Sequence, residues 1–92
     1  MDIDAVRREA SQAGLVEIYH NATSRVVSFA APSHQSSPLT RINVYYTTGT
    51  VGTCLDHPRQ GKTQLFRRNV NLALLRQLFQ EPSLGNPNYG PL

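Results

Sequence analysis

The stretch TRINVYYTTGTVGTCLDH, residues 40–57, carries the clearest structural signal in the chain. In its first half, side chains expected to face inward alternate with side chains expected to face outward, a pattern typical of a strand with one buried face. Thr48 and Gly49 then supply a turn, because glycine adopts a positive φ without steric cost. Val51 and Leu55 share one face of the return strand, so the stretch predicts a β-hairpin. The inward set is Ile42, Val44 and Tyr46, and the outward set is Arg41, Asn43 and Tyr45.

Two further strands are predicted before the hairpin, at residues 15–20 and 25–30. Both are rich in β-branched and aromatic residues, which favour extended backbone. The segment APSHQSSP, residues 31–38, has no periodicity and is expected to form a mobile loop. In the first strand, the alternating residues are Val16 and Ile18 against Glu17 and Tyr19.

A helix is predicted at each end of this set of strands. Asp2 or Asp4 can cap a helix at residues 2–13, and Gly14 suits the position that ends it. Near the other end, Asn71 caps a helix at residues 72–80. A hydrophobic staple of Val70 with Leu75 marks its start, and its apolar face consists of Leu74, Leu75, Leu78 and Phe79.

One more strand is predicted between the hairpin and the last helix, with Leu65 or Phe66 pointing inward. The elements together predict a small two-layer α+β domain at residues 1–81, followed by a flexible tail or linker at residues 82–92. Short links make the sheet an antiparallel meander of four or five strands. The N-terminal and C-terminal helices can pack on only one of its faces, so the other face is expected to stay open.

The chain has 92 residues and a single cysteine. One cysteine cannot form an intrachain disulfide, which excludes a secreted disulfide scaffold. The first residues contain no continuous apolar run, so we expect neither a signal peptide nor a membrane contact. An intracellular protein, cytoplasmic or nuclear, is the expectation.

Positive charge is concentrated in one block of the sequence. The chain carries a net charge of +3, yet between residues 24 and 80 only Asp56 is acidic. Such asymmetry favours a polyanionic partner, and arginine suits bidentate contacts to phosphates or bases. A solvated surface that only aids solubility is the alternative interpretation. The basic residues of the block are Arg25, Arg41, Arg59, Lys62, Arg67, Arg68 and Arg76.

The segment DHPRQGKT, residues 56–63, ends like a phosphate-binding loop. That motif requires an earlier glycine where this chain has Asp56, whose carboxylate would repel a phosphate. Pro58 also lacks the backbone N–H that such a loop uses. We therefore interpret the segment as a basic β-turn with Arg59 and Lys62 at its tip.

Cys54 and His57 have a spacing found in zinc sites, but no second pair of ligands with such spacing exists. The same pair lacks a recognisable third group for nucleophilic catalysis. We therefore expect no metal, no cofactor and no enzymatic activity.

The open sheet face is the candidate functional surface. Arginine and lysine neutralise phosphates, tyrosine offers a stacking platform, and asparagine and glutamine can bind base edges. The expected function is a non-catalytic nucleic-acid-binding module that uses the basic sheet face and the turn at residues 56–63, with RNA or single strands favoured over duplex DNA. The alternative is a protein-interaction or assembly module that pairs or dimerises through a sheet edge. The candidate nucleic-acid-binding residues are Arg41, Asn43, Tyr45, Arg59, Lys62, Gln64, Arg67 and Arg68.

Overall fold

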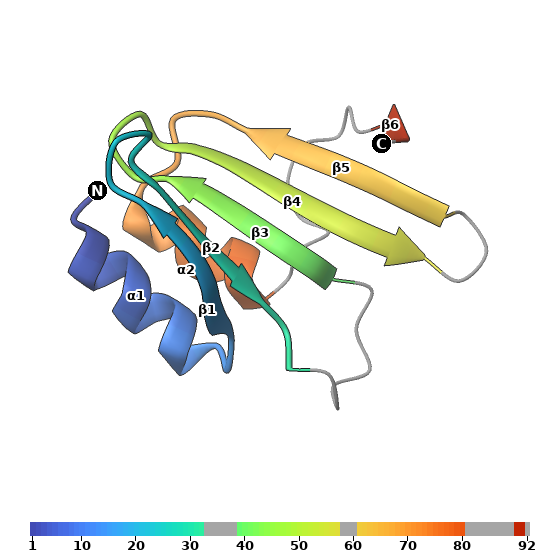
Figure 1. The fold of residues 1–92 in the computed structure, drawn as a ribbon, viewed down its shortest axis with the longest axis horizontal. Helices are drawn as coiled ribbons and strands as arrows, with labels where there is room; N and C mark the ends of the chain where they lie inside the picture. Colours follow the sequence, from blue (N-terminus) through green and yellow to red (C-terminus); the bar gives the residue numbers. More distant parts are fainter. Residues whose placement is uncertain (33–38, 58–60, 81–89, 92) are drawn as a thin grey trace.

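The predicted hairpin forms the centre of an antiparallel sheet with strand order β1-β2-β3-β4-β5-β6 (Figure 1). The computed structural model describes residues 1–32, 39–57, 61–80 and 90–91. At the hairpin turn, Gly49 has a φ of 77° and its N–H donates to the carbonyl oxygen of Tyr45 at 2.9 Å. The elements are α1 (Ile3–Gln12), β1 (Val16–Asn21), β2 (Val26–Ala30), β3 (Leu39–Tyr45), β4 (Thr50–His57), β5 (Gly61–Arg67), α2 (Leu72–Gln80) and β6 (Gly90–Pro91).

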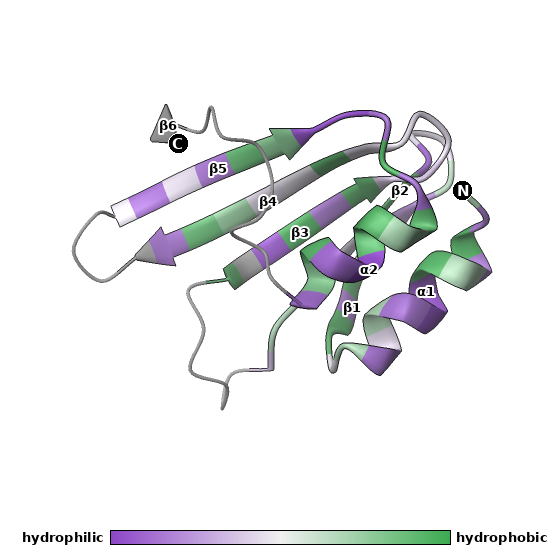
Figure 2. Ribbon diagram, turned by 180° about the vertical axis from the view of Figure 1, so that it is seen from behind, coloured by the Kyte–Doolittle hydropathy of each residue, from purple (hydrophilic) through white to green (hydrophobic). Residues whose placement is uncertain are grey.

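Both helices lie over the same face of the sheet, which confirms the predicted two-layer α+β meander (Figure 2). Alternate strand residues project toward the helices and form one core with them. Phe29 and Phe79 meet edge to face in this core, with ring centroids 5.6 Å apart. The buried core includes Val6, Ala10, Val27, Phe29, Ile42, Val44, Val51, Leu55, Leu65, Leu75, Leu78 and Phe79.

The helix ends follow the predicted capping pattern. The Asp2 carboxylate accepts a hydrogen bond from the N–H of Ala5 at 3.2 Å, and Gly14 takes a φ of 78° after α1. The Asn71 side-chain oxygen accepts from the N–H of Leu74 at 2.9 Å, so Asn71 caps α2. These bonds satisfy N–H groups that the first turn of a helix leaves without a backbone partner.

Strand β1 departs from the simple alternation predicted for it. The pairing with β2 shifts between Glu17 and Tyr19, so a bulge interrupts the strand. Val16 and Ile18 are 52% and 48% exposed. Val16 pairs with Ala30 before the bulge, and Ile18 lies at the bulge itself. Glu17 lies opposite the core residue Phe29 and instead binds a helix residue: the Arg7 Nε donates to its carboxylate at 2.7 Å. An extra residue in one strand reverses the side on which the following side chains project, and local propensity does not encode it.

Two of the predicted segments fall largely outside the described residues. Of the loop at residues 31–38, only 31 and 32 are described. Of the tail at residues 82–92, Gly90 and Pro91 are described, and they pair with Gln64 and Thr63 as the short strand β6.

A bidentate ion pair joins the two helices. The Arg76 Nε and Nη2 donate to the two carboxylate oxygens of Glu9 at 2.7 and 2.9 Å. This hydrogen bonding, together with the charges of Arg76 and Arg8, lowers the pKa of Glu9. Arg76 therefore contributes its charge to the helix layer and not to the open face of the sheet.

The lowered pKa of Glu9 predicts a loss of stability in acid. The pair stabilises the folded state while Glu9 is ionised, and this contribution disappears as the pH falls through the pKa of the folded protein. We expect acidification to lower the melting temperature of the wild type more than that of Glu9→Gln. Thermal unfolding followed by circular dichroism at neutral and acidic pH measures the difference. Equal losses in the two proteins would show that the pair contributes nothing.

A candidate ligand site on the open sheet face

The open face is the side of the sheet opposite the two helices. Residues paired across neighbouring strands project to the same side, so the register identifies its side chains. One row crosses five strands and contains Tyr19, Ser28, Asn43, Gly52 and Phe66. Three aromatic residues remain well exposed on this face, Tyr19 at 45%, Tyr45 at 39% and Phe66 at 48%.

The structure divides the predicted site residues between the two faces. Arg41, Asn43 and Tyr45 lie together on the open face of β3, where Arg41 pairs with Cys54 and Cys54 with Gln64. Lys62 follows on the same face of β5, opposite the exposed Asp56.

The remaining predicted residues do not join this group. Arg67 pairs with Val51, a core residue, and so projects to the helix-bearing side of the sheet. Arg68 is exposed and follows the end of β5. Arg59 lies outside the described residues. The basic block of the sequence is therefore not one continuous surface, and among its members within the strands Arg41 and Lys62 lie on the open face.

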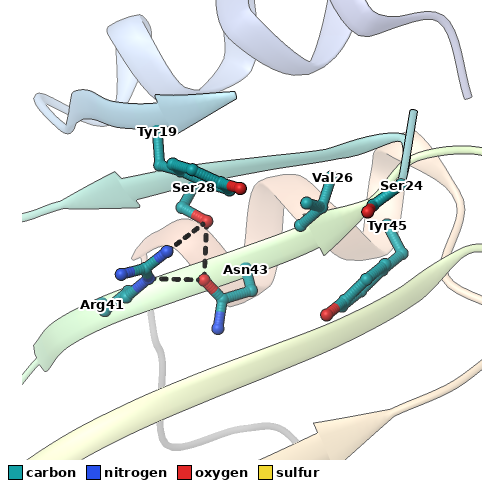
Figure 3. Close-up of a pocket in the computed structure, with 7 residues that line it drawn as sticks. All are labelled: Tyr19, Ser24, Val26, Ser28, Arg41, Asn43 and Tyr45. Atoms are coloured by element: carbon teal, nitrogen blue, oxygen red, sulfur yellow. Dashed lines mark hydrogen bonds between the residues drawn. The ribbon is translucent and has the colours of Figure 1, made fainter. Parts of the chain in front are cut away.

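A shallow hollow of about 280 Å³ opens on this face between β1, β2 and β3 (Figure 3). Ser28 and Val26 form a buried floor, although α1 and α2 both lie on the other side of the sheet. Tyr19 and Tyr45 stand on opposite sides of it. The hollow is lined by Tyr19, Ser24, Val26, Ser28, Arg41, Asn43 and Tyr45.

Three hydrogen bonds fix the polar side chains of the hollow. The Ser28 hydroxyl donates to Asn43 Oδ1 at 2.6 Å, and Arg41 Nε donates to the same oxygen at 2.7 Å. Arg41 Nη2 donates to Ser28 Oγ at 3.2 Å. Because a guanidinium only donates, the Asn43 amide must turn its oxygen toward Arg41. Its nitrogen consequently points away from both partners, as Figure 3 shows.

Arg41 forms no ion pair with a carboxylate of the described residues. Among the described residues, ion pairs involve Arg7 and Arg76, both of which belong to the helices. Arg41 instead lies over the ring of Tyr19, with the guanidinium carbon 5.6 Å from the ring centroid. A cation held by an aromatic face and by neutral acceptors keeps its field available to an anionic ligand.

Cys54 lies beside this site and is half-buried. Burial raises the pKa of its thiol, and the charge of nearby Arg41 acts in the opposite direction without reversing the shift. Since the thiolate is the reactive form of cysteine, a raised pKa disfavours nucleophilic chemistry at this position. Within the described ranges, no three His, Cys, Asp or Glu side chains gather in a way that could hold a metal ion.

The triplet Gly61, Lys62 and Thr63 belongs to a strand. Gly61 opens β5 with a φ of 78°, and Thr63 is buried in the sheet opposite Leu55. A phosphate-binding loop would place these residues before the N-terminus of a helix. The strand position of the triplet therefore argues against a nucleotide loop. Residues 58–60 of the predicted turn, Arg59 among them, lie outside the described residues, and Lys62 lies within β5 opposite Asp56 rather than at the tip.

Sequence reasoning missed three residues that shape the open face, Tyr19, Ser28 and Phe66. Tyr19 reaches the hollow through the bulge in β1, which no local signal marked. The sequence allowed either Leu65 or Phe66 to point inward, and Leu65 is the one buried in the core. For Phe66 the sequence did offer a signal, since a glycine inside a strand, here Gly52, often marks a place where another group lies close to the backbone. A Cβ at Gly52 would lie 3.2 Å from the Phe66 ring.

Comparisons with protein-family models, curated proteins and solved structures find no match for this chain. In the parts that the structure describes, no helix combines the length and apolar character needed to cross a bilayer.

Proposed function

We propose that this domain binds single-stranded nucleic acid, RNA or DNA, on the open face of its sheet. The observation that carries the proposal is the hollow, in which Arg41, without an ion pair to any described carboxylate, shares one surface with two exposed tyrosines. Aromatic rings offer stacking surfaces to bases, and cations on the same face attract the phosphate backbone. A single strand presents both groups to a flat surface, since its bases are free of pairing.

Each part of the open face has a role in this proposal. Phe66 provides a stacking surface in the row that contains Asn43, and Tyr45 provides another in the next row, two residues along β3. Lys62 lies near one end of β5 and serves as a contact to a phosphate. The helices pack their apolar faces on the sheet, so neither offers a free basic face for the major groove of a duplex.

Replacing Tyr45 by alanine is expected to weaken binding of a single-stranded oligonucleotide by about 1–3 kcal/mol, because one stacking surface is lost. The melting temperature should change little, since Tyr45 lies outside the core. Filter-binding titrations with single-stranded and double-stranded oligonucleotides of the same length measure both affinity and strand preference. The proposal fails if the wild type binds neither at low salt, or if duplex binds as well as single strand.

Lys62 and Arg8 provide a matched pair of charge controls. Each is exposed, but Lys62 lies on the open face and Arg8 on α1. Lys62→Ala should lower the slope of log affinity against log salt by about 1, the value expected for one lost phosphate contact. Arg8→Ala should leave that slope unchanged, whereas equal changes would mean that only net charge matters.

Exposed apolar residues on the edge strand support a second candidate function, assembly with another protein chain. Val16 and Ile18 are exposed on β1, which forms one edge of the sheet within the described residues. An edge strand with apolar side chains can recruit a further strand, although the bulge at Glu17 and Tyr19 reduces its regularity. Light scattering over a range of protein concentrations tests this candidate, and a strict monomer without a protein partner rejects it.

A further inference from the structure

The hydrogen bonds within the hollow determine which polar groups remain for a ligand. The Asn43 oxygen already accepts from Ser28 and Arg41, so its amide nitrogen is the part that faces outward. The Ser28 hydroxyl donates its only proton to that oxygen and its oxygen accepts from Arg41. Asparagine usually offers a donor and an acceptor side by side, but here the acceptor is occupied.

Arg41 reinforces this one-sided character. A guanidinium has five N–H donors and no acceptor, and the three hydrogen bonds of the network use only Nε and one N–H of Nη2. The remaining N–H groups of Arg41 are not engaged by the described residues in any hydrogen bond to a side chain or ion pair. One N–H of Nη1 and one of Nη2 remain side by side on the outer edge of the planar guanidinium, so Arg41 presents two neighbouring donors and a positive charge. Asn43 adds a further donor through its amide nitrogen.

Bases differ in whether they can satisfy two neighbouring donors. Guanine has adjacent acceptors at O6 and N7, and cytosine has adjacent acceptors at O2 and N3. Adenine places its amino group beside both N1 and N7, and uracil places an N–H between its two carbonyl oxygens. Adenine and uracil would therefore bring a donor against the paired donors of Arg41.

We infer that the hollow is a base-selective subsite that takes a nucleobase edge with two adjacent acceptors, on guanine or cytosine, and rejects adenine and uracil. The inference rests on the proposed function and adds a specificity to it. The ring of the base lies against Tyr45 and the buried Val26, which give the hollow an apolar side as well as a polar one. A bare phosphate would use the donors but leave this apolar side in water.

The test uses single strands of equal length that differ at one central pair of nucleotides. Oligouridine strands with a central GG, CC or AA pair are titrated against the full chain, beside plain oligouridine and a strand with two central abasic sites. We expect GG or CC to bind about tenfold more tightly than AA, the discrimination typical of a two-donor contact. A central pair of 7-deazaguanines, which lack N7, then tests how guanine is bound. If guanine is bound through O6 and N7, this strand should lose the affinity advantage of the GG strand over the AA strand.

The possible results distinguish this inference from the proposed function. Equal and salt-sensitive binding of all strands, the abasic one included, would overturn base selection and leave nucleic-acid binding intact. No binding of any strand would overturn the proposed function. Tighter binding of AA than of GG and CC would contradict the donor-only arrangement directly.

Asn43→Asp provides the matched variant, because it exchanges the outward donor for an acceptor in a side chain of the same shape. The carboxylate also pairs with Arg41, so the preference for GG or CC over AA should disappear. Lys62→Ala is the control: it should weaken binding of all strands to the same extent and leave their ratio unchanged. An unchanged ratio in a folded Asn43→Asp protein would overturn the inference, and if that variant does not fold, the base substitutions still decide it.

Discussion

Replacing Phe79 by alanine is expected to reduce the free energy of unfolding by about 3–5 kcal/mol, the usual cost of removing a buried aromatic side chain. Phe79 is 3% exposed and lies at the end of α2, where its ring meets Phe29 edge to face at 5.6 Å. The substitution removes the buried ring area and opens a cavity between the helix layer and the sheet. For a small domain whose total stability is about 5–15 kcal/mol, a loss of this size should produce a large fall in melting temperature.

Phe66→Ala is the control for this prediction, since it removes the same side chain from the other side of the sheet. Phe66 is half exposed and covers Gly52 rather than the core. Its removal should cost less than about 1.5 kcal/mol, because most of its area is already in water or in loose contact. Urea unfolding of both variants measures the difference. Similar costs for the two would mean that the sheet buries its apolar residues equally on both faces, contrary to the two-layer arrangement.

Gly49→Val is expected to cost about 2–4 kcal/mol through two separate effects, backbone strain and crowding. Gly49 holds a φ of 77°, where a β-branched side chain is strained. A Cβ at this position would also lie 3.1 Å from the carbonyl oxygen of Val70, which belongs to the backbone and cannot rotate away. The same segment donates the Val70 N–H to the carbonyl oxygen of Gly49 at 2.9 Å, so the turn is tied to the start of α2.

Gly61→Val separates strain from crowding. Gly61 has nearly the same φ, 78°, but a Cβ there would meet nothing within 4 Å. Gly61→Val should therefore reduce the free energy of unfolding through backbone strain alone, by about 1–2 kcal/mol. Chemical denaturation of the two variants gives the two costs. If Gly61→Val proved as damaging as Gly49→Val, the contact between the hairpin turn and Val70 would have no energetic weight.

A comparison of the two sheet faces explains why the residues of the candidate site were harder to predict than the fold. On the helix-bearing face, alternation and the staple of Val70 with Leu75 identified buried residues directly, since burial follows local periodicity. On the open face, the important relation is between side chains on different strands. Arg41 and Asn43 were recognised as neighbours because they lie two residues apart on one strand. Ser28, which fixes both of them, lies on β2 and could not be placed without the register.

The amino-acid sequence was enough to predict the helices with their caps, the central hairpin, the antiparallel order and an open sheet face. These features depend on the period of apolar residues and on capping and turn residues, which act over a few positions. Only the tertiary structure decided the bulge that turns Tyr19 toward Arg41, the side on which Arg67 projects, and the pairing of Arg76 with Glu9. Each of these depends on strand register or on contacts between distant segments, where a shift of one residue reverses the face of every side chain that follows.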